Sequence, residues 1–560
     1  MKKKDLTGAE YICELLKHND ITHVFYQELA FYFTTKIMKD YGLKNILAHS
    51  EGAAGYMADG YSRATGKACV CMSQAIGSAN LAASLHDAWL GSTPVVALTG
   101  FKMNSAYQRN GYQESDHRAH FSGVTKYNDY TLDEQQLPFM LRQCLREATT
   151  GQPRPTHLDV VGYAGEMAEK AIMNDTYIPD TKISAIPAFR AYAPEGDIKA
   201  AADIINEAKK PVIVAGRGAK ISDFSGTSIY ELAAKADIPV ATTPDGKSII
   251  DETDPLWAGV VGGYGMDCAN KTTAASDLVI YIGSMVSDQT TLNFTAPKMG
   301  TNIIQIDIEG AQIGKNYENT TGLLGDAKLV TEQLTAAINK NERPKWRDEI
   351  KAFVNDTNSK QLKIAHNNRA PIQTACLCKD LSSLLPDDAI VVADTGWSAT
   401  WASTMFRMKP SQLFMRAAGS LGWSYPASLG AKCGAPEKPV ICFCGDGGFY
   451  YHMAEMETAV RYGINTVTIV NNNSRLNQCI PYVGEAYTGA SDNYNDYREK
   501  VTFQKISFAE IAEKFGVTGI KIESTKDIAP AIKKALLMKN PVVIEVITDW
   551  SSDGPLPAFE

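Results

Sequence analysis

Pro439-Val-Ile-Cys-Phe-Cys-Gly-Asp-Gly447 and Thr466-Val-Thr-Ile-Val-Asn-Asn-Asn473 are two apolar, strand-like runs that each end in glycine or polar residues. Asp446 precedes Asn473 by 27 residues (473 − 446), which fits a strand end, a loop, a helix and the next parallel strand. A right-handed crossover would place both side chains at the carboxyl edge of one sheet, where open α/β sheets bind ligands. Carboxylate and amide oxygens are hard ligands that suit Mg²⁺. The two runs therefore predict a cation site in an α/β domain.

The composition is that of a globular protein, and it excludes some classes of partner. The chain has 560 residues, of which 44% are apolar and 21% charged, with a net charge of −8. This length predicts three domains of ordinary size, and the acidic balance argues against a nucleic-acid partner. The basic N-terminus Met1–Lys4 leads into no apolar segment, and no uncharged stretch approaches a membrane span. We expect a cytoplasmic protein with no membrane partner.

The cysteines do not form a metal-binding or disulfide pattern. Eleven are present, including the CxC pairs Cys69/Cys71, Cys376/Cys378 and Cys442/Cys444. Two of these pairs lie in strand-like runs, and no CxxC pair or histidine at zinc spacing accompanies them. We expect the cysteines to be buried as small apolar residues in a reducing compartment.

Short apolar runs alternate with helical patterns along the chain, which predicts parallel sheets covered by helices. Two stretches, 172–195 and 341–369, look like linkers because the first is rich in Pro, Asp and Thr and the second is strongly charged. They divide the chain into three doubly wound α/β units, near 1–170, 190–340 and 370–550. The first and third units each contain a glycine-bearing helix followed by a CxC strand, which suggests two related domains.

With these features together, the whole chain resembles the superfamily of thiamine-diphosphate-dependent decarboxylases and acetolactate synthases. The resemblance implies that 1–170 binds the cofactor's pyrimidine, that 190–340 is a central domain, and that 370–550 binds the diphosphate through Mg²⁺. The metal ligands implied are the side chains of Asp446 and Asn473 and the main-chain carbonyl of Arg475. In this superfamily the cofactor lies between the first domain of one subunit and the third domain of another, so we expect a homodimer or homotetramer.

Glu51 is the second residue on which the resemblance depends, within Leu47-Ala-His-Ser-Glu-Gly-Ala-Ala-Gly-Tyr-Met57. The superfamily requires a carboxyl bonded to the pyrimidine N1′, so that the cofactor's own amino group can remove a weakly acidic C–H proton. Such a carboxyl works best where apolar neighbours raise its pKa, and Ala, Gly and Met surround Glu51. The alternative is a surface glutamate at a helix N-terminus. Asn80 is a further residue that we expect to bind the cofactor.

The remaining cofactor contacts are also implied by the resemblance. Leu421, in Ala418-Gly-Ser-Leu-Gly-Trp423, would prop the cofactor in a bent conformation that brings its amino group close to the reacting carbon, while backbone at Gly419 bonds the pyrimidine. A core leucine in a turn is the alternative. Backbone N–H groups of two loops would bind the diphosphate, and their residues are Thr395, Gly396, Trp397, Ser398, Gly445, Gly447 and Gly448.

The substrate is less constrained than the cofactor. Gly111-Tyr-Gln-Glu114 and Val124-Thr-Lys126 resemble segments of acetolactate synthases and of benzaldehyde lyase. Gln113 would hydrogen-bond an intermediate or an acceptor carbonyl, and Lys126 would attract a carboxylate, unless it forms a structural salt bridge. His49, His86 and His117 are candidate proton shuttles because of the pKa of histidine. The alternative for each is a structural histidine, which is the more common case.

Two segments depart from the acetolactate synthase pattern on the substrate side. The chain has Val24-Phe-Tyr-Gln-Glu-Leu29 where a Gly- and Pro-bearing turn is usual, and Asn473-Ser-Arg-Leu-Asn-Gln-Cys-Ile-Pro-Tyr482 lacks the usual Gly-Met-Val and Trp. The sequence therefore supports activation of the cofactor more strongly than it supports pyruvate as the donor substrate. In the central unit, Ala215-Gly-Arg-Gly218 and Gly283–Asp288 resemble a domain that can hold FAD in a non-redox role, or that is empty and structural.

We expect a thiamine-diphosphate enzyme that decarboxylates a 2-oxo acid and joins the product to a second carbonyl, as acetolactate synthases do. The alternatives are a simple 2-oxo acid decarboxylase or a lyase of 2-hydroxy ketones. A NAD(P)-dependent oxidoreductase is disfavoured because no GxGxxG motif follows a strand with an acidic residue at the expected distance. A non-catalytic scaffold would have lost Glu51, Asp446 or Asn473, and all three are present.

Overall fold

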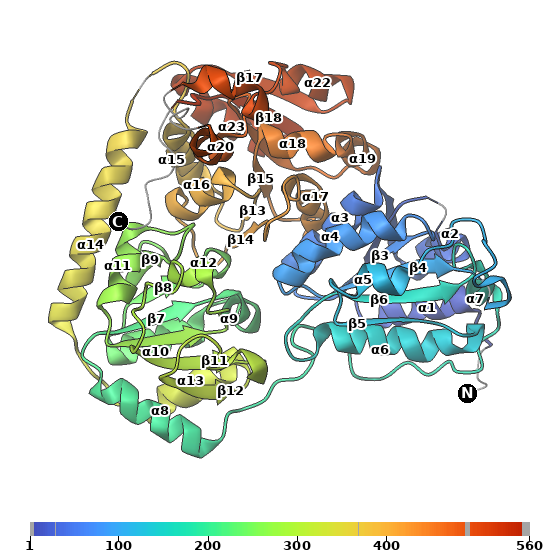
Figure 1. Cartoon of the computed structure of the whole chain (residues 1–560), viewed down its shortest axis with the longest axis horizontal. Helices are drawn as coiled ribbons and strands as arrows, with labels where there is room; N and C mark the ends of the chain where they lie inside the picture. The colour runs from blue at the N-terminus through green and yellow to red at the C-terminus, as the bar shows by residue number, and fades with distance from the viewer. Residues whose placement is uncertain (1–4, 29, 103, 368, 488–492, 552–560) are drawn as a thin grey trace.

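The computed structural model describes residues 5–28, 30–102, 104–367, 369–487 and 493–551. Met1–Lys4 and Leu29, which entered the expectations above, lie outside these ranges. Three parallel, six-stranded sheets carry the chain, each with its own helices (Figure 1). The predicted fold class is confirmed. Within the described ranges, none of the helices combines the length and apolar character needed to cross a membrane.

The first and third sheets have the same strand order. The first runs β2-β1-β3-β4-β6-β5 and the third β14-β13-β15-β16-β18-β17, which is the same permutation of six strands. This shared topology supports the relation between the two domains that the sequence suggested. The strands of the first sheet are β1 His23–Tyr26, β2 Lys44–Leu47, β3 Cys69–Ser73, β4 Val95–Phe101, β5 Tyr127–Tyr130 and β6 Thr156–Val161. Those of the third are β13 Ile390–Ala393, β14 Leu413–Arg416, β15 Val440–Gly445, β16 Val467–Asn472, β17 Thr518–Ile522 and β18 Val542–Ile547.

The central sheet has the order β12-β11-β10-β7-β8-β9, in which the first and fourth strands in sequence lie side by side at its middle, as in dinucleotide-binding folds. Its strands are β7 Pro211–Ala215, β8 Val240–Thr242, β9 Trp257–Val260, β10 Leu278–Ile282, β11 Asn302–Asp307 and β12 Thr320–Leu324.

Helices cover both faces of the sheets, because alternate strand residues are buried on opposite sides. In β3, for example, Cys69 and Cys71 join one apolar cluster while Val70 and Met72 join another. The N-terminal helices are α1 Gly8–His18, α2 Tyr32–Ile37, α3 Glu51–Thr65, α4 Ser78–Leu90, α5 His117–Phe121, α6 Leu137–Thr149 and α7 Glu166–Lys170. The central ones are α8 Glu195–Glu207, α9 Arg217–Ser222, α10 Thr227–Ala236, α11 Asp267–Ala275, α12 Asp288–Thr291 and α13 Ala327–Ala337. The C-terminal ones are α15 Thr374–Leu384, α16 Trp397–Met405, α17 Ser424–Gly434, α18 Asp446–His452, α19 Glu455–Tyr462, α20 Ile480–Ala486, α21 Arg498–Val501, α22 Phe508–Lys514 and α23 Ile528–Leu536.

The linker expected at 341–369 is mostly a helix, α14 Pro344–Ala365, which runs along the edge of the central domain toward the C-terminal domain (Figure 1). Its buried residues Trp346, Ile350, Thr357, Gln361 and Ala365 recur at helical spacing on one side, while its charges face solvent. Charge density therefore misled the sequence interpretation, because it reflected one exposed face of a helix.

The N-terminal and C-terminal domains of one chain pack through α3 and α17, at a distance that only glycine allows. A Cβ at Gly60 would lie 2.0 Å from the carbonyl oxygen of Ala427, and one at Gly430 would lie 1.8 Å from that of Met57. This close crossing fixes the first domain of the chain against its own third domain.

Candidate functional site

Asp446 begins α18 directly after β15, and Asn473 follows the neighbouring strand β16, as the spacing predicted. The carboxyl group of Asp446 is 3% exposed and accepts N–H bonds from Gly447 (2.7 Å), Asn473 (3.1 Å) and Arg475 (3.1 Å). Burial raises the pKa of Asp446 to about 6, against the lowering effect of these N–H donors. The two polar turns thus meet at one sheet edge.

The oxygen donors at this edge fit Mg²⁺. The side-chain oxygen of Asn473 lies 3.1 Å from the N–H of Arg475, so it is held beside the Asp446 carboxylate. Within the described ranges, no lysine or arginine forms an ion pair with Asp446. The Arg475 guanidinium instead bonds Tyr494 at 2.7 Å and stacks over Trp550 at 3.9 Å. A buried carboxylate bonded only by backbone N–H groups is suited to a hard divalent cation.

A cavity of about 320 Å³ opens at this sheet edge. Every residue that lines it lies between Thr374 and Cys479, in the third domain. α16 begins at the cavity, and its unpaired backbone N–H groups can bind an anion there. The cavity brings together all twelve cofactor residues expected from this domain, namely Thr395, Gly396, Trp397, Ser398, Gly419, Leu421, Gly445, Asp446, Gly447, Gly448, Asn473 and Arg475.

Two buried carboxylates bind the turn at residues 418–424, which carries Leu421. The sequence interpretation did not select either of them. Asp394, after β13, accepts N–H bonds from Gly422 and Ser424, both at 3.0 Å, and burial raises its pKa. Asp87, on α4 of the first domain, is fully buried and accepts N–H bonds from three successive residues, Ala418 (3.0 Å), Gly419 (3.0 Å) and Ser420 (2.9 Å). The sequence signal that could have identified Asp87 is its position as a lone carboxylate in the otherwise uncharged α4.

Glu51 lies at the start of α3, outside the cavity that holds Asp446. The side chain of Asn80 donates to its carboxylate at 3.2 Å, so two of the residues expected to bind the cofactor lie in contact. Gly77 leaves room for this carboxylate, because a Cβ there would lie 2.5 Å from Glu51 Oε1. The side-chain oxygen of Gln113 accepts the N–H of Ile76 at 3.2 Å, which places Gln113 against the loop that carries Gly77. The first domain thus forms its own cluster around Glu51.

Lys126 lies apart from this cluster. Its ammonium donates to the backbone carbonyls of Thr150 and, at 3.2 Å, of Gln152. Burial lowers its pKa. These contacts hold a loop at the boundary with the central domain, so the contact of Lys126 with a substrate carboxylate stays a prediction without a structural counterpart.

The candidate proton shuttles are differently placed. His49 bonds Glu457 at 2.8 Å on the surface, and His117 bonds the buried Asp159 at 2.7 Å. His86 is exposed on α4. His49 and His117 therefore already have acidic partners within the chain.

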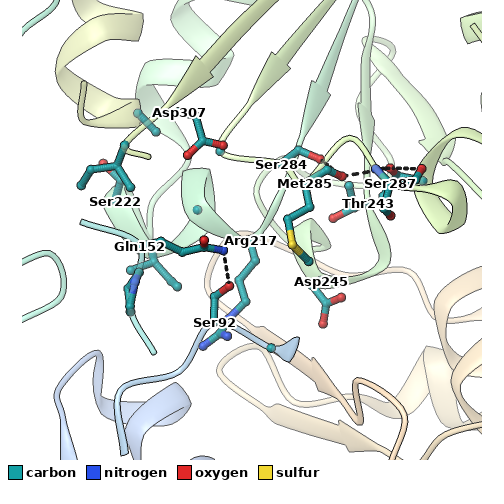
Figure 2. Close-up of a pocket in the computed structure, with 18 of the residues that line it drawn as sticks. Ser92, Gln152, Arg217, Ser222, Thr243, Asp245, Ser284, Met285, Ser287 and Asp307 are labelled. Atoms are coloured by element: carbon teal, nitrogen blue, oxygen red, sulfur yellow. Dashed lines mark hydrogen bonds between the residues drawn. The ribbon is translucent and has the colours of Figure 1, made fainter. Parts of the chain in front are cut away.

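A second cavity, of about 170 Å³, lies between the central and first domains (Figure 2). Ser92 and Gln152 of the first domain, which share a hydrogen bond of 2.9 Å, face Arg217 and Ser284 of the central domain. Burial lowers the pKa of Arg217 to about 9. Asp307, at the end of β11, also lines the cavity, and burial raises its pKa to about 6.

Comparison with known proteins matches all three domains to families. Residues 6–120 match the thiamine pyrophosphate enzyme N-terminal TPP binding domain, 198–334 the central domain and 394–546 the C-terminal TPP binding domain. A probable acetolactate synthase large subunit of Methanocaldococcus jannaschii is 30% identical over 98% of this chain and 93% of its own length. The corresponding protein of Methanococcus aeolicus is 31% identical over 91% of this chain and 86% of its own. The acetolactate synthase isozyme 1 large subunit of Escherichia coli is 27% identical over 98% and 95% respectively.

Proposed function

The chain belongs to the thiamine pyrophosphate enzyme family, and from this premise we propose that it decarboxylates a 2-oxo acid and joins the resulting acyl unit to a second carbonyl, as an acetolactate synthase does. The observation that carries the proposal is the cavity at the edge of the third sheet, where a buried Asp446 carboxylate, the Asn473 amide and a helix N-terminus face one space. These groups match the needs of a diphosphate with its Mg²⁺.

In this proposal Asp446, Asn473 and the main-chain carbonyl of Arg475 hold Mg²⁺, and N–H groups at the start of α16 bind the diphosphate. The thiazolium ring of the bound cofactor supplies the electron sink that decarboxylation requires. Leu421 would contact the bound cofactor, and Asp87 and Asp394 hold the turn that carries it. The chain's own residues thus bind and orient the cofactor and exclude water around it.

Glu51 holds the proton that activation of the cofactor requires. Its carboxyl would bond the pyrimidine N1′, with Asn80 orienting it through the observed 3.2 Å hydrogen bond. Ser50 caps α3 by accepting the N–H of Ala53 at 3.1 Å, which fixes the backbone at Glu51. Gln113, bonded to the adjacent loop, is the proposed contact for the acceptor carbonyl.

We propose that a second copy of the chain completes the site, in a homodimer or homotetramer. The Asp446 cavity is lined by the third domain alone, and Glu51 lies elsewhere on the same chain. Mixing the inactive variants Glu51→Gln and Asp446→Ala during refolding tests this arrangement. If the two residues come from different subunits, random dimers regain about a quarter of the wild-type sites. If both come from one chain, mixing restores nothing.

The reaction itself is tested by following carbon-13-labelled pyruvate with thiamine diphosphate and Mg²⁺. Acetolactate with CO₂ supports carboligation, and an aldehyde with CO₂ supports the runner-up, a simple decarboxylase. Cleavage of a 2-hydroxy ketone without CO₂ would identify the lyase alternative. If bound cofactor supports none of these on pyruvate, further 2-oxo acids and 2-hydroxy ketones are tested, because Val24–Tyr26 and Asn473–Tyr482 depart from the acetolactate synthase pattern.

The central cavity is the proposed place for a nucleotide such as FAD in a non-redox role. Its carboxylate at Asp307, its hydroxyls and its apolar walls suit a ribose and a ring. The nearby glycines are already used for packing, because a Cβ at Gly216 would lie 2.4 Å from the carbonyl oxygen of Gly283. These glycines therefore do not form the GxGxxG loop on which a NAD(P)-dependent oxidoreductase would rely. Flavin absorbance after denaturing the purified protein tests FAD occupancy.

A further inference from the structure

A buried cluster in the first domain holds two imidazoles and a carboxylate, apart from the Asp446 cavity and the Glu51 cluster. His117, His157 and Asp159 are each no more than 1% exposed, and one ligand atom from each lies within 4.8 Å of the others. His117 Nδ1 is 2.7 Å and His157 Nε2 is 3.5 Å from Asp159 Oδ1. Three potential metal ligands therefore converge on one point.

The fold brings the three side chains together from two elements, β6 and α5, beside Thr99 of β4. His157 and Asp159 stand two residues apart on β6, so they point to the same face of the sheet. Thr99, opposite Asp159 on β4, places its hydroxyl 2.7 Å from His157 Nε2 and also in contact with Asp159 Oδ1. His117 is the first residue of α5.

The hydrogen-bond partners of His157 assign the tautomer of its ring. The Asn128 amide donates to the carbonyl of Arg118 at 2.7 Å, so its oxygen is the atom that faces His157 Nδ1 at 2.8 Å. His157 Nδ1 therefore carries the hydrogen. In that tautomer Nε2 carries the lone pair, which accepts the Thr99 hydroxyl hydrogen at 2.7 Å. Without a metal, His117 Nδ1 can donate to Asp159 Oδ1 at 2.7 Å while the Thr99 hydroxyl donates to His157 Nε2 at 2.7 Å, and a cation between the three ligand atoms would take the place of both hydrogens.

We propose that His117 Nδ1, His157 Nε2 and an Asp159 oxygen bind one divalent transition-metal ion of the Zn²⁺ type. Two imidazoles and a carboxylate are a ligand set that such ions favour, and Zn²⁺ with bonds of about 2.0–2.2 Å places its ligands roughly 3.3 Å apart. The observed separations of 2.7 Å and 3.5 Å bracket that value. The hydrogen bond that His157 Nδ1 donates to the Asn128 side-chain oxygen fixes the ring tautomer that leaves Nε2 for the metal.

A cavity of about 370 Å³ adjoins the cluster and could admit a fourth ligand to the proposed metal. His117 and Asp159 line it together with Ser115, Tyr107 and Tyr130. Within the described ranges, Ser115 Oγ is buried and has no hydrogen-bond partner. An unsatisfied hydroxyl at this wall indicates a polar ligand in the cavity, such as a water or an anion on the metal. The site is therefore of the open, three-ligand kind.

Co²⁺ titration of the metal-stripped full-length protein, with excess Mg²⁺ to fill the Asp446 site, tests the proposal. The wild type should bind one equivalent and develop the visible absorption of tetrahedral Co²⁺. His117→Asn and His157→Asn should bind at least about 100-fold more weakly, and Asn128→Ala about 10- to 100-fold more weakly. The control His120→Asn, at an exposed ring 6.3 Å from that of His117, should match the wild type, as should Asp446→Ala.

Failure of the wild type to bind Co²⁺ stoichiometrically would overturn the proposal, and this result does not depend on any variant's folding. Binding that persists unchanged in both His117→Asn and His157→Asn would overturn it as well. Because the readout is a metal spectrum, it is independent of the catalytic assays and of the proposed thiamine chemistry.

Discussion

Replacing Asp87 by asparagine should weaken cofactor binding, although Asp87 lies on the first domain of the chain and outside the Asp446 cavity. Each carboxylate oxygen receives two donors: one receives Ala418 N and, at 3.3 Å, Arg63, and the other receives Gly419 N and Ser420 N. Asparagine keeps one oxygen and places an NH₂ group against the other pair. Two of the four hydrogen bonds are therefore lost in either orientation of the amide.

The size of the effect follows from these two bonds. A hydrogen bond to a charged group contributes about 1.5–3 kcal/mol, and the low end applies because the turn is partly exposed and water can replace the carboxylate. Two bonds then amount to about 3 kcal/mol. If cofactor binding must restore the turn that carries Gly419 and Leu421, this cost corresponds to about 100-fold in affinity.

Calorimetric titration with thiamine diphosphate at saturating Mg²⁺ measures this change, with circular dichroism to verify the fold. Asp388→Asn is the matched control, because Asp388 is exposed in the loop before β13. The control should bind as the wild type does. An Asp87→Asn protein that is folded and binds the cofactor with wild-type affinity would show that the Asp87 carboxylate does not hold the turn for the cofactor.

Three further predictions concern the site itself. Glu51→Gln should lose turnover by at least about 100-fold while the Kd for the cofactor, measured by calorimetry, changes little; a fully active variant would contradict the proposed proton role. Cofactor affinity at fixed Mg²⁺ should fall as pH drops below about 6, because the metal requires ionised Asp446, whose pKa is raised to about 6, and it should be flat above that pH; affinity independent of pH from 5 to 8 would contradict the metal assignment. Gly396→Ala should lose about 1–3 kcal/mol in urea unfolding and also weaken cofactor binding, because φ is +70° and a Cβ would lie 2.6 Å from Gln478 Oε1. Its control Gly463→Ala, at φ +63° with no neighbour within 4 Å, should lose stability without affecting the cofactor.

Local sequence patterns were enough to place Asp446 and Asn473 at one sheet edge. Their spacing encodes a strand, a helix and a parallel strand, and the handedness of that unit leaves little freedom. Asp87 was missed because its partners lie 331–333 residues away, and no local pattern records which turn a buried carboxylate will meet. The helix α14 was missed because its charges were read without the helical spacing of its apolar face.

Contacts between segments that are far apart in the sequence explain the remaining differences. The position of Lys126 depends on where the loop around Gln152 meets the central domain, which the Thr-Lys motif does not specify. The His117, His157 and Asp159 cluster unites a helix start with two positions of a strand that lies about 40 residues further on, as the separation of 42 between His117 and Asp159 shows. Such a cluster has none of the short spacings that identify metal sites in sequence.

Exchange of the cofactor's reactive C–H proton with deuterium, followed by NMR on bound thiamine diphosphate, measures activation of the cofactor without any substrate. We expect fast exchange in the wild type with Mg²⁺ and exchange at least about 100-fold slower in Glu51→Gln. Wild-type protein that binds the cofactor but exchanges its proton no faster than Glu51→Gln does would contradict the account that this chain activates thiamine diphosphate through Glu51.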